Sequence, residues 1–169
     1  VHDERKAKIM KIHAFGVRDD EKQAFEQISA QCGVEVMLSD ETPSLENADL
    51  VKGYEGVTAL GMGNIDRDLL SRYSENGVRF LSTRTIGYNH IDLVAAKELG
   101  IKVCNAAYPP NGVADFTVMM ILMCLRQYKQ ALWRGQVNDF SLQGLQGRDM
   151  NELTIGVMGT GRIGQIGRA

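Results

Sequence analysis

Near its carboxyl end the chain reads Glu152-Leu153-Thr154-Ile155-Gly156-Val157-Met158-Gly159-Thr160-Gly161-Arg162-Ile163-Gly164. Leu153, Ile155 and Val157 alternate with other residues in a pattern that predicts a short buried strand. The glycines that follow have the spacing G-x-G-x-x-G, and a helix is expected to begin there. In a dinucleotide-binding turn the first glycine makes the tight turn, the second lets the backbone approach a pyrophosphate, and the third lets helix pack on strand. The phosphate charge would then face the unpaired N–H groups at the helix start.

The same residues are compatible with a plain strand-to-helix turn, because 18 of the 169 residues are glycine. In a dinucleotide-binding unit, an acidic residue about 20 positions after the motif holds the ribose hydroxyls, and that position falls beyond Ala169. A complete β-α-β unit needs roughly 30 residues. We therefore expect the sequence to be the first part of a longer protein. Gly167 is a weak helix former within the expected cofactor helix, which puts its pyrophosphate affinity in question.

The composition is that of a soluble globular protein, with 44% hydrophobic and 24% charged residues. The net charge is −2 and no basic stripe is present, which argues against a nucleic-acid partner. The three cysteines (Cys32, Cys104 and Cys124) are far apart and predict buried, reduced thiols in a cytoplasmic protein. The longest apolar run, residues 118–125, is far shorter than the roughly 20 residues that span a membrane, so no membrane partner is expected.

Strand and helix patterns alternate along the first two thirds of the chain. Residues 1–9 are mostly charged and predict a disordered leader. The first strand is expected around residues 11–17, and the first helix is expected to be capped by Asp19 or Asp20 and closed by Gly33. Further strands are predicted at residues 34–38, 57–60, 78–82 and 101–104, and further helices at residues 44–48, 66–75 and 91–99. This alternation predicts an α/β domain, with a parallel sheet covered by helices on both faces.

The pattern changes after Tyr108-Pro109-Pro110-Asn111, where we place the domain boundary. Residues 10–108 then form one domain, and residues 109–169 form a linking helix and the beginning of a second. Residues 113–133 predict one long helix that is apolar nearly all round and therefore buried between other elements. A membrane-binding or partner-binding helix is the alternative. Residues 135–151 predict a meandering loop.

Two further stretches could carry chemistry. Residues 82–92 run from a strand end through Gly87 into a helix start. Ligands of open parallel sheets bind outside the carboxyl ends of the strands, so the N–H groups of Ile86 and Gly87 could hold a carboxylate. An ordinary loop with Asn89 as helix cap is the alternative. Tyr108 lies at the rigid turn between domains, where its phenol could reach a ligand or where the turn could serve only as a hinge.

The histidines do not predict an acid–base catalyst. No carboxylate stands at a spacing that would orient His90, which we expect to be structural or exposed, and His13 falls inside the first strand as a residue at the edge of the core. The sequence contains neither a serine-nucleophile elbow nor a cluster spaced for metal, so no catalytic residue and no metal ligand is predicted.

Taken together, the three stretches resemble one family. Residues 83–92 (Thr-Arg-Thr-Ile-Gly-Tyr-Asn-His-Ile-Asp), residues 105–117 (Asn-Ala-Ala-Tyr-Pro-Pro-Asn-Gly-Val-Ala-Asp-Phe-Thr) and residues 159–164 (Gly-Thr-Gly-Arg-Ile-Gly) are similar, in order and spacing, to motifs of the D-isomer-specific 2-hydroxyacid dehydrogenases. Within that family the match is to the D-lactate dehydrogenase-like branch.

The resemblance implies a flavodoxin-like substrate-binding domain joined by a long helix to a Rossmann domain. In the cleft between them, NADH would reduce a 2-oxo acid to the D-2-hydroxy acid. It further implies a homodimer. It assigns the substrate carboxylate to Ile86 and Gly87, the substrate pocket to Tyr108, the nicotinamide to Val113, and the cofactor pyrophosphate to Gly159, Gly161, Arg162, Ile163 and Gly164.

The family's catalytic Arg, Glu and His belong to the later half of its Rossmann domain, so the 169-residue chain is expected to be inactive by itself. Chemically, an Arg is needed to polarise the keto group and a His to supply the proton. Two other functions stay open. One is an NAD-sensing protein of the same fold without catalysis, and the other is a flavodoxin-like binding module that uses no dinucleotide.

Overall fold

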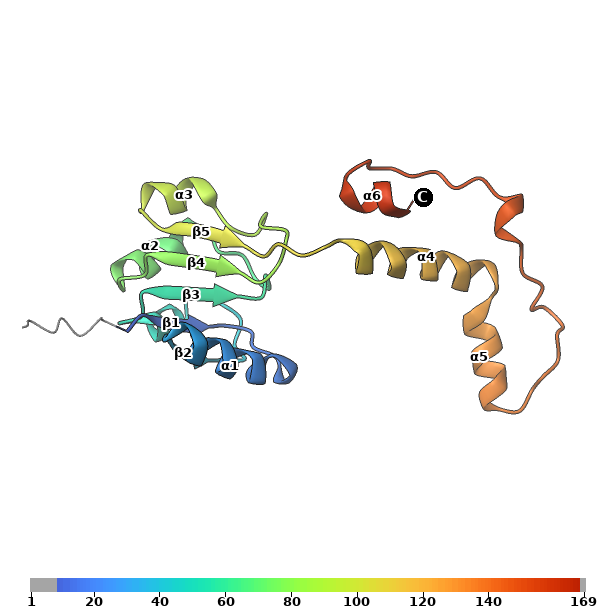
Figure 1. The fold of residues 1–169 in the computed structure, drawn as a ribbon, viewed down its shortest axis with the longest axis horizontal. Helices are drawn as coiled ribbons and strands as arrows, with labels where there is room; N and C mark the ends of the chain where they lie inside the picture. Colours follow the sequence, from blue (N-terminus) through green and yellow to red (C-terminus); the bar gives the residue numbers. More distant parts are fainter. Residues whose placement is uncertain (1–8, 168–169) are drawn as a thin grey trace, which may run out of the picture. The chain divides into compact units, whose positions relative to one another are not determined.

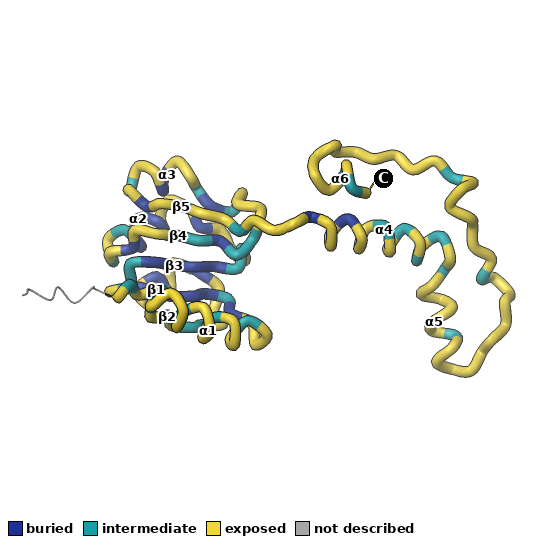
Figure 2. Tube along the Cα trace, viewed as in Figure 1, coloured by how far each residue is buried: buried dark blue, intermediate teal, exposed yellow. Residues whose placement is uncertain are grey.

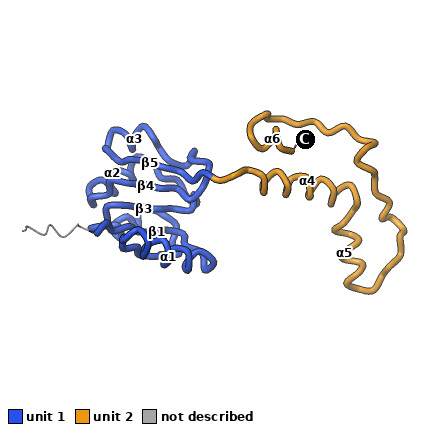
Figure 3. Tube along the Cα trace, viewed as in Figure 1, with its two compact units in different colours: residues 1–107 blue, residues 108–169 orange. Residues whose placement is uncertain are grey.

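The computed structural model of the protein describes residues 9–167. It divides into two compact units, Val1–Ala107 and Tyr108–Ala169, which Figure 3 colours separately. The first unit holds the whole sheet, and the second holds the remaining helices. Residues 1–8, which make up most of the predicted leader, lie outside the described residues, as do residues 168–169.

A five-stranded parallel sheet forms the centre of the first unit, with strand order β2-β1-β3-β4-β5 (Figure 1). The strands are β1 (Lys11–Ala14), β2 (Glu35–Leu38), β3 (Gly56–Ala59), β4 (Phe80–Thr83) and β5 (Lys102–Asn105). The register aligns Ile12 with Gly56, Gly56 with Phe80 and Phe80 with Lys102. The predicted parallel α/β sheet is confirmed, with each strand within a few residues of its expected position.

Helices cover both faces of this sheet. The elements of the first unit are η1 (Asp19–Glu21), α1 (Lys22–Cys32), η2 (Ala48–Val51), α2 (Arg67–Glu75) and α3 (Leu93–Glu98). The chain runs through α1 towards one edge of the sheet, and through α2 and α3 towards the other. Because parallel crossovers are right-handed, α1 lies on one face, and α2 and α3 lie on the opposite face.

The hydrophobic core fills the face that carries α2 and α3. Leu69, Leu70 and Tyr73 of α2 are buried together with Val57 and Leu81 of the sheet. Burying each large apolar side chain contributes about 1.5–3 kcal/mol. None of the residues of α1, all of which the structure describes, is buried. Figure 2 shows the buried residues of the sheet in the strands β1, β3 and β4, and further buried residues on the α2 and α3 side of the first unit.

Several helix ends agree with the local sequence signals, and others do not. Gly33 ends α1 with a φ of 63°, as predicted. Asp66 caps α2 by accepting a hydrogen bond from the Leu69 amide at 3.1 Å. The alternative in which Asn89 caps the next helix is wrong, because the Asp92 carboxylate accepts from the Ala95 amide of α3 at 2.9 Å.

Two further local predictions in this unit were wrong. Asp19 and Asp20 do not cap α1, because their carboxylates pair with Lys22 and Arg18 instead. The helix expected at residues 44–48 is displaced to the short 3-10 helix η2, where Asn47 holds the preceding loop by donating to the Thr42 carbonyl oxygen at 2.9 Å.

The second unit contains α4 (Asn111–Leu125), α5 (Tyr128–Gln136), η3 (Met150–Glu152) and α6 (Arg162–Gly167). The single helix predicted for residues 113–133 is therefore broken, because Gln127 has a left-handed φ of 50° between α4 and α5. Its predicted burial was also wrong. Ala114 alone is buried among the residues of α4, all of which the structure describes, and Phe116 is 55% exposed. The helix has an apolar surface that the described chain leaves open.

The strand predicted before the glycine motif is absent from the described residues. Residues 153–157 adopt no regular structure, and Ile155 and Val157 are 43% and 48% exposed. A parallel strand needs a neighbour to satisfy its backbone groups, and every strand of the described chain belongs to the first unit. The alternating apolar residues are present in the sequence, but without a partner strand these residues form no inter-strand hydrogen bonds.

The cysteines also differ from expectation. All three are free thiols, as predicted, but Cys32, Cys104 and Cys124 are exposed and not buried. Cys32 and Cys104 line a cavity beneath α1, and Cys124 lies on the open surface of α4. Among the residues described, no helix is long and apolar enough to cross a membrane.

Candidate functional site

The carboxyl ends of β3, β4 and β5 meet at one edge of the first unit, because the three strands are parallel and adjacent. Residues 84–92 leave β4 at this edge and lead to α3 (Figure 1). Residues 60–66 leave β3, and residues 106–107 leave β5, at the same edge. This is the part of an open parallel sheet where ligands bind, and it contains Ile86 and Gly87.

Residues 84–92 form the loop that follows β4, termed the β4 loop. Three consecutive carbonyl groups of this loop accept hydrogen bonds. The Ala106 amide donates to the Thr85 carbonyl oxygen at 3.0 Å. The Asn105 side-chain Nδ2 donates to the Ile86 carbonyl oxygen at 2.8 Å. The Thr85 hydroxyl donates to the Gly87 carbonyl oxygen at 2.7 Å. The loop is therefore fixed from β5 and from within itself.

The amides of the same loop are free. Among the described residues, no acceptor takes the N–H groups of Ile86 or Gly87. Both residues are exposed at the edge of the sheet. Backbone N–H groups that are held in place and left unpaired can receive a carboxylate through charge-assisted hydrogen bonds.

The loop that leaves β3 supports this arrangement. Gly61 has a φ of +89°, and a Cβ built on it would lie 2.9 Å from the Thr85 Cγ2 and 3.1 Å from the Thr85 Oγ1. Further along, the Ile65 amide donates to the His90 carbonyl oxygen at 2.7 Å, and the Asp92 amide donates to the Ile65 carbonyl oxygen at 3.0 Å. The β3 loop thus packs against the β4 loop and is bridged to it.

Arg84 anchors the start of the β4 loop to the first helix. Its guanidinium pairs with the Glu21 carboxylate at 3.2 Å, donates to the Gly16 carbonyl oxygen at 2.8 Å, and lies 5.4 Å from the centre of the Phe25 ring. Partial burial opposes ionisation of Glu21, but hydrogen bonds from the Arg18 amide and from Arg84, together with the charges of both arginines, lower the pKa of this carboxyl overall.

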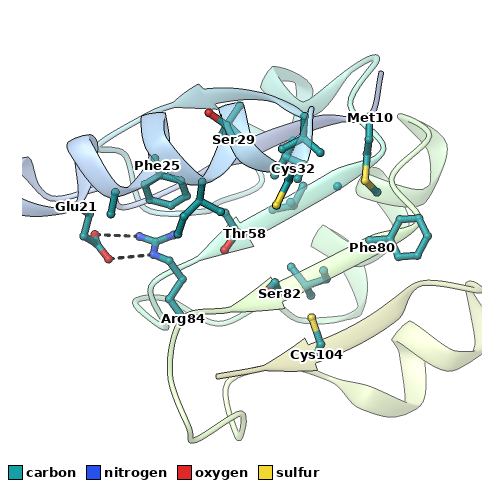
Figure 4. Close-up of a pocket in the computed structure, with 18 of the residues that line it drawn as sticks. Met10, Glu21, Phe25, Ser29, Cys32, Thr58, Phe80, Ser82, Arg84 and Cys104 are labelled. Carbon is teal, nitrogen blue, oxygen red and sulfur yellow. Dashed lines mark hydrogen bonds and ion pairs between the residues drawn. The ribbon is translucent and has the colours of Figure 1, made fainter. Parts of the chain in front are cut away.

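The Arg84–Glu21 pair closes one end of an apolar cavity of about 630 Å³ beneath α1 (Figure 4). Phe25 and Cys32 of α1, and Phe80 and Cys104 of the sheet, are among its lining residues. Its walls are overwhelmingly apolar. The charge of Arg84 at its end is already paired with Glu21, so the cavity is less suited to a carboxylate than the loop at residues 85–87.

Neither described histidine is placed as an acid–base catalyst. His13 is 4% exposed, lies 4.4 Å from the Phe15 ring and 5.4 Å from the Tyr54 ring, and has no hydrogen-bond partner among the described residues. Burial lowers its pKa, and the charge of Glu41 opposes that shift only in part. The Nε2 of His90 is likewise buried without a partner in the described chain. Within the described residues no group of side chains could hold a metal ion.

The other predicted site residues belong to the second unit. Tyr108 is 49% exposed at the start of that unit, and Val113 is 47% exposed in the first turn of α4. Gly159 has a φ of +99°, and a Cβ on Gly164 would collide with the Gly159 carbonyl oxygen. A Cβ on Gly161 would meet no described atom within 4 Å. The turn therefore requires glycine at two positions and is open at the third.

Arg162 begins α6 directly after this turn, and Ile163 follows with 44% of its surface exposed. The turn and the helix start of the predicted dinucleotide motif are thus present, whereas its strand is not. The residues that the sequence analysis missed are Gly61, Thr85 and Asn105. Gly61 had a local signal, because it follows the strand predicted at residues 57–60, but nothing local indicated the contact of Asn105 with Ile86.

Comparison with known proteins identifies the family. Residues 12–161 match the family described as D-isomer specific 2-hydroxyacid dehydrogenase, catalytic domain. The chain belongs to this family. The motifs that carried the resemblance lie at the carboxyl edge of the sheet, at the junction of the units and at the glycine turn.

Among the relatives, an aromatic 2-oxoacid reductase of Clostridium sporogenes is 44% identical over 92% of this chain and 47% of its own length. The apo-structure of D-lactate dehydrogenase from Escherichia coli has a TM-score of 0.81 at 33% identity, over 94% of this chain and 50% of that one. D-lactate dehydrogenase from Aquifex aeolicus, solved in complex with NAD and lactic acid, has a TM-score of 0.78 at 28% identity, over 92% and 46%. The chain thus spans about half the length of the relatives it matches.

Proposed function

We propose that the protein to which these residues belong reduces a 2-oxo acid to the D-2-hydroxy acid, with NADH as the reductant. The single observation that carries the proposal is the β4 loop. In a member of the dehydrogenase family, Ile86 and Gly87 present two unpaired amides on a backbone whose carbonyl groups are all held. A 2-oxo acid supplies the matching group, a carboxylate next to the carbon that is reduced.

In this proposal the first unit is the substrate-binding domain, and residues 109–169 provide the linking helix and the start of the cofactor domain. Ile86 and Gly87 donate their amides to the substrate carboxylate, Tyr108 lines the substrate pocket and Val113 lies near the nicotinamide. The pyrophosphate is held by Gly159, Gly161, Arg162, Ile163 and Gly164.

The glycine turn fits a dinucleotide, because Gly161 is open where a pyrophosphate would approach and Gly159 has the positive φ of the tight turn. The bound NADH would supply the hydride. The residues of this chain bind and orient, and the Arg, Glu and His that complete the chemistry are assigned by the family resemblance to later positions. By themselves, residues 1–169 are proposed to be inactive.

We further propose a cytoplasmic homodimer. The proposal of a dimer is supported by α4, whose exposed apolar side chains would be covered by a second copy; they are Val113, Phe116, Met119, Met120 and Leu122. A cytoplasmic location is supported by the free, exposed thiols of Cys32, Cys104 and Cys124. Light scattering on the product of the whole gene tests the dimer, and a monomeric mass at working concentration would refute it.

The function is tested by expressing the gene to its own stop codon and following NADH absorbance with pyruvate and with phenylpyruvate. The expected result is turnover that yields the D-enantiomer, and no turnover by the 169-residue chain at equal concentration. NADH binding without turnover of any 2-oxo acid would favour the NAD-sensing alternative. If the protein neither binds NADH nor turns over a 2-oxo acid, the alternative of a flavodoxin-like binding module is favoured.

A further inference from the structure

We propose that Asn105 is a positioning residue for substrate binding, and that the hydroxyl of Thr85 assists it. Asn105 sets the direction of the Gly87 amide and thereby the affinity for the substrate carboxylate. This inference rests on the proposed function and adds to it two residues that do not themselves contact the substrate.

In a trans peptide the C=O of one residue and the N–H of the next lie in one plane and point in opposite directions. A group that holds a carbonyl oxygen therefore also fixes the direction of the following N–H. The Ala106 amide holds the Thr85 carbonyl and thus orients the Ile86 N–H. Asn105 Nδ2 holds the Ile86 carbonyl at 2.8 Å and thus orients the Gly87 N–H.

The two amides differ in what holds them. A backbone group orients the Ile86 N–H, and no substitution of a side chain removes that group. A side chain from β5 orients the Gly87 N–H, across 19 residues of sequence. Glycine is the residue with the greatest backbone freedom. Without Asn105, the peptide between Ile86 and Gly87 would lose its only hydrogen bond among the described residues.

The Thr85 hydroxyl holds the peptide on the other side of Gly87. It carries one proton, and its partner at 2.7 Å is the Gly87 carbonyl oxygen, which can only accept. The Thr85 hydroxyl oxygen also lies 2.7 Å from the hydroxyl oxygen of Thr83. Because the Thr85 proton is already donated to Gly87, Thr83 must be the donor in this second hydrogen bond. Thr83 is 1% exposed, so this chain of hydroxyl groups starts in the core and ends at Gly87. Gly87 is consequently held at both of its peptide bonds.

Hydrogen bonding also strengthens the donor. A carbonyl that accepts a hydrogen bond polarises its peptide group, and linked bonds of this kind reinforce one another by about 10–30% each. The Gly87 N–H is thus both aimed and polarised by Asn105. A carboxylate that receives this N–H would bind more tightly than one that meets a freely rotating peptide.

The test uses the protein expressed from the whole gene, with pyruvate and phenylpyruvate as substrates. Asn105→Leu keeps the approximate shape of the side chain and removes the donor. We expect the KM for the 2-oxo acid to rise about tenfold, which is the low end for loss of a hydrogen bond to a charged group. The NADH dissociation constant is expected to stay within about twofold, because the cofactor turn lies elsewhere in the chain.

A matched control is Asn76→Leu. Asn76 also donates its side-chain amide to a backbone carbonyl, that of Ala48 at 3.0 Å, but it lies at the end of α2, before β4 begins. This variant is expected to lose stability without a change in KM. Thr85→Val and Thr85→Ser form a second pair, because valine removes the hydroxyl and serine keeps it. We expect Thr85→Val to raise the KM for the 2-oxo acid and Thr85→Ser to keep it close to the wild-type value.

Amide NMR spectra report directly on the orientation of the Gly87 N–H group. In Asn105→Leu the Gly87 N–H resonance should shift, while the Ile86 N–H resonance changes little. An unchanged KM in Asn105→Leu, in an active protein, would overturn the inference and leave the proposed function standing. An equal rise in KM in Asn76→Leu would show a merely structural effect and overturn it as well. If the wild-type protein turns over no 2-oxo acid, the proposed function fails and the inference fails with it.

Discussion

The substitution Gly61→Ala tests whether the β3 loop fixes the β4 loop. Gly61 has a φ of +89°, and its missing Cβ would lie 2.9 Å from the Thr85 Cγ2. Alanine at a positive φ costs about 1–2 kcal/mol in backbone strain. Forcing an extra carbon into a filled contact costs typically about 1–3 kcal/mol more. We therefore expect Gly61→Ala to lower the free energy of unfolding by about 2–5 kcal/mol.

Gly77→Ala provides the matched control. Gly77 has a φ of +95°, but a Cβ there would meet nothing within 4 Å, so only the backbone strain applies. The expected loss is about 1–2 kcal/mol. Native-state hydrogen exchange at the amides of β3 and β4 measures both losses. This readout is preferable to fluorescence, because the only tryptophan, Trp133, lies in α5 of the second unit.

A double-mutant cycle identifies the contact that is responsible. Thr85→Ser removes the Cγ2 atom and keeps the hydroxyl. Gly61→Ala combined with Thr85→Ser should be less destabilised than the sum of the single changes, by about 1 kcal/mol. Equal destabilisation by Gly61→Ala and Gly77→Ala, together with strict additivity in the cycle, would refute the packing of the β3 loop on Thr85.

Three further substitutions test groups whose pKa or hydrogen bonding the fold perturbs. His13→Phe should raise stability by about 1 kcal/mol at pH 7, because both ring nitrogens of His13 are buried without a described partner. Burial lowers the pKa of His13, so the folded state binds fewer protons than the unfolded state below about pH 6.5. Wild-type stability should thus fall as the pH drops from about 6.5 towards the folded pKa, and the variant should lose this pH dependence. If urea unfolding shows the same dependence of stability on pH for both proteins, that dependence does not come from His13.

Glu21→Gln should lower stability by about 1–2 kcal/mol at pH 7, because it removes the charge that pairs with Arg84. The pKa of Glu21 is lowered in the folded state, so this contribution is present above the unfolded value of about 4.3 and is lost as the pH falls through the folded pKa. The difference between wild type and variant should accordingly narrow in acid, and a difference independent of pH would exclude the ion pair as its cause. Burial raises the pKa of Tyr73, and its hydroxyl has no hydrogen-bond partner among the described residues. Because no hydrogen bond is lost, Tyr73→Phe should leave the free energy of unfolding unchanged or raise it by up to about 1 kcal/mol in the same assay. A clear loss of stability would point to a partner for the hydroxyl.

Local signals in the sequence predicted most of the first unit. Alternating apolar segments located all five strands, and Gly33, which has a positive φ, marks the end of α1 as expected. Such signals work because backbone conformation at glycine and the spacing of apolar residues act within a few positions. The predicted carboxylate loop at Ile86 and Gly87 followed from the same reasoning, since it lies directly after a strand.

The predictions that failed depend on partners distant in sequence. Residues 153–157 have the pattern of a buried strand, but no described strand stands beside them, and they remain irregular. Gln127 separates α4 from α5 with a left-handed backbone that glutamine does not signal. Asn105 could not be recognised as a clamp on Ile86, because the contact depends on the pairing of β4 with β5. The cap of α3 was misplaced by three residues, since Asn89 and Asp92 are both suitable caps.

A crystal structure of the whole-gene protein with NADH and oxamate, an unreactive analogue of pyruvate, tests the central claim most directly. We predict that the oxamate carboxylate lies within about 3.2 Å of the amide nitrogens of both Ile86 and Gly87. The hydrogen bonds from Asn105 to the Ile86 carbonyl and from Thr85 to the Gly87 carbonyl should be retained. A carboxylate bound elsewhere, with the two amides facing solvent, would contradict the assignment of this loop as the substrate site.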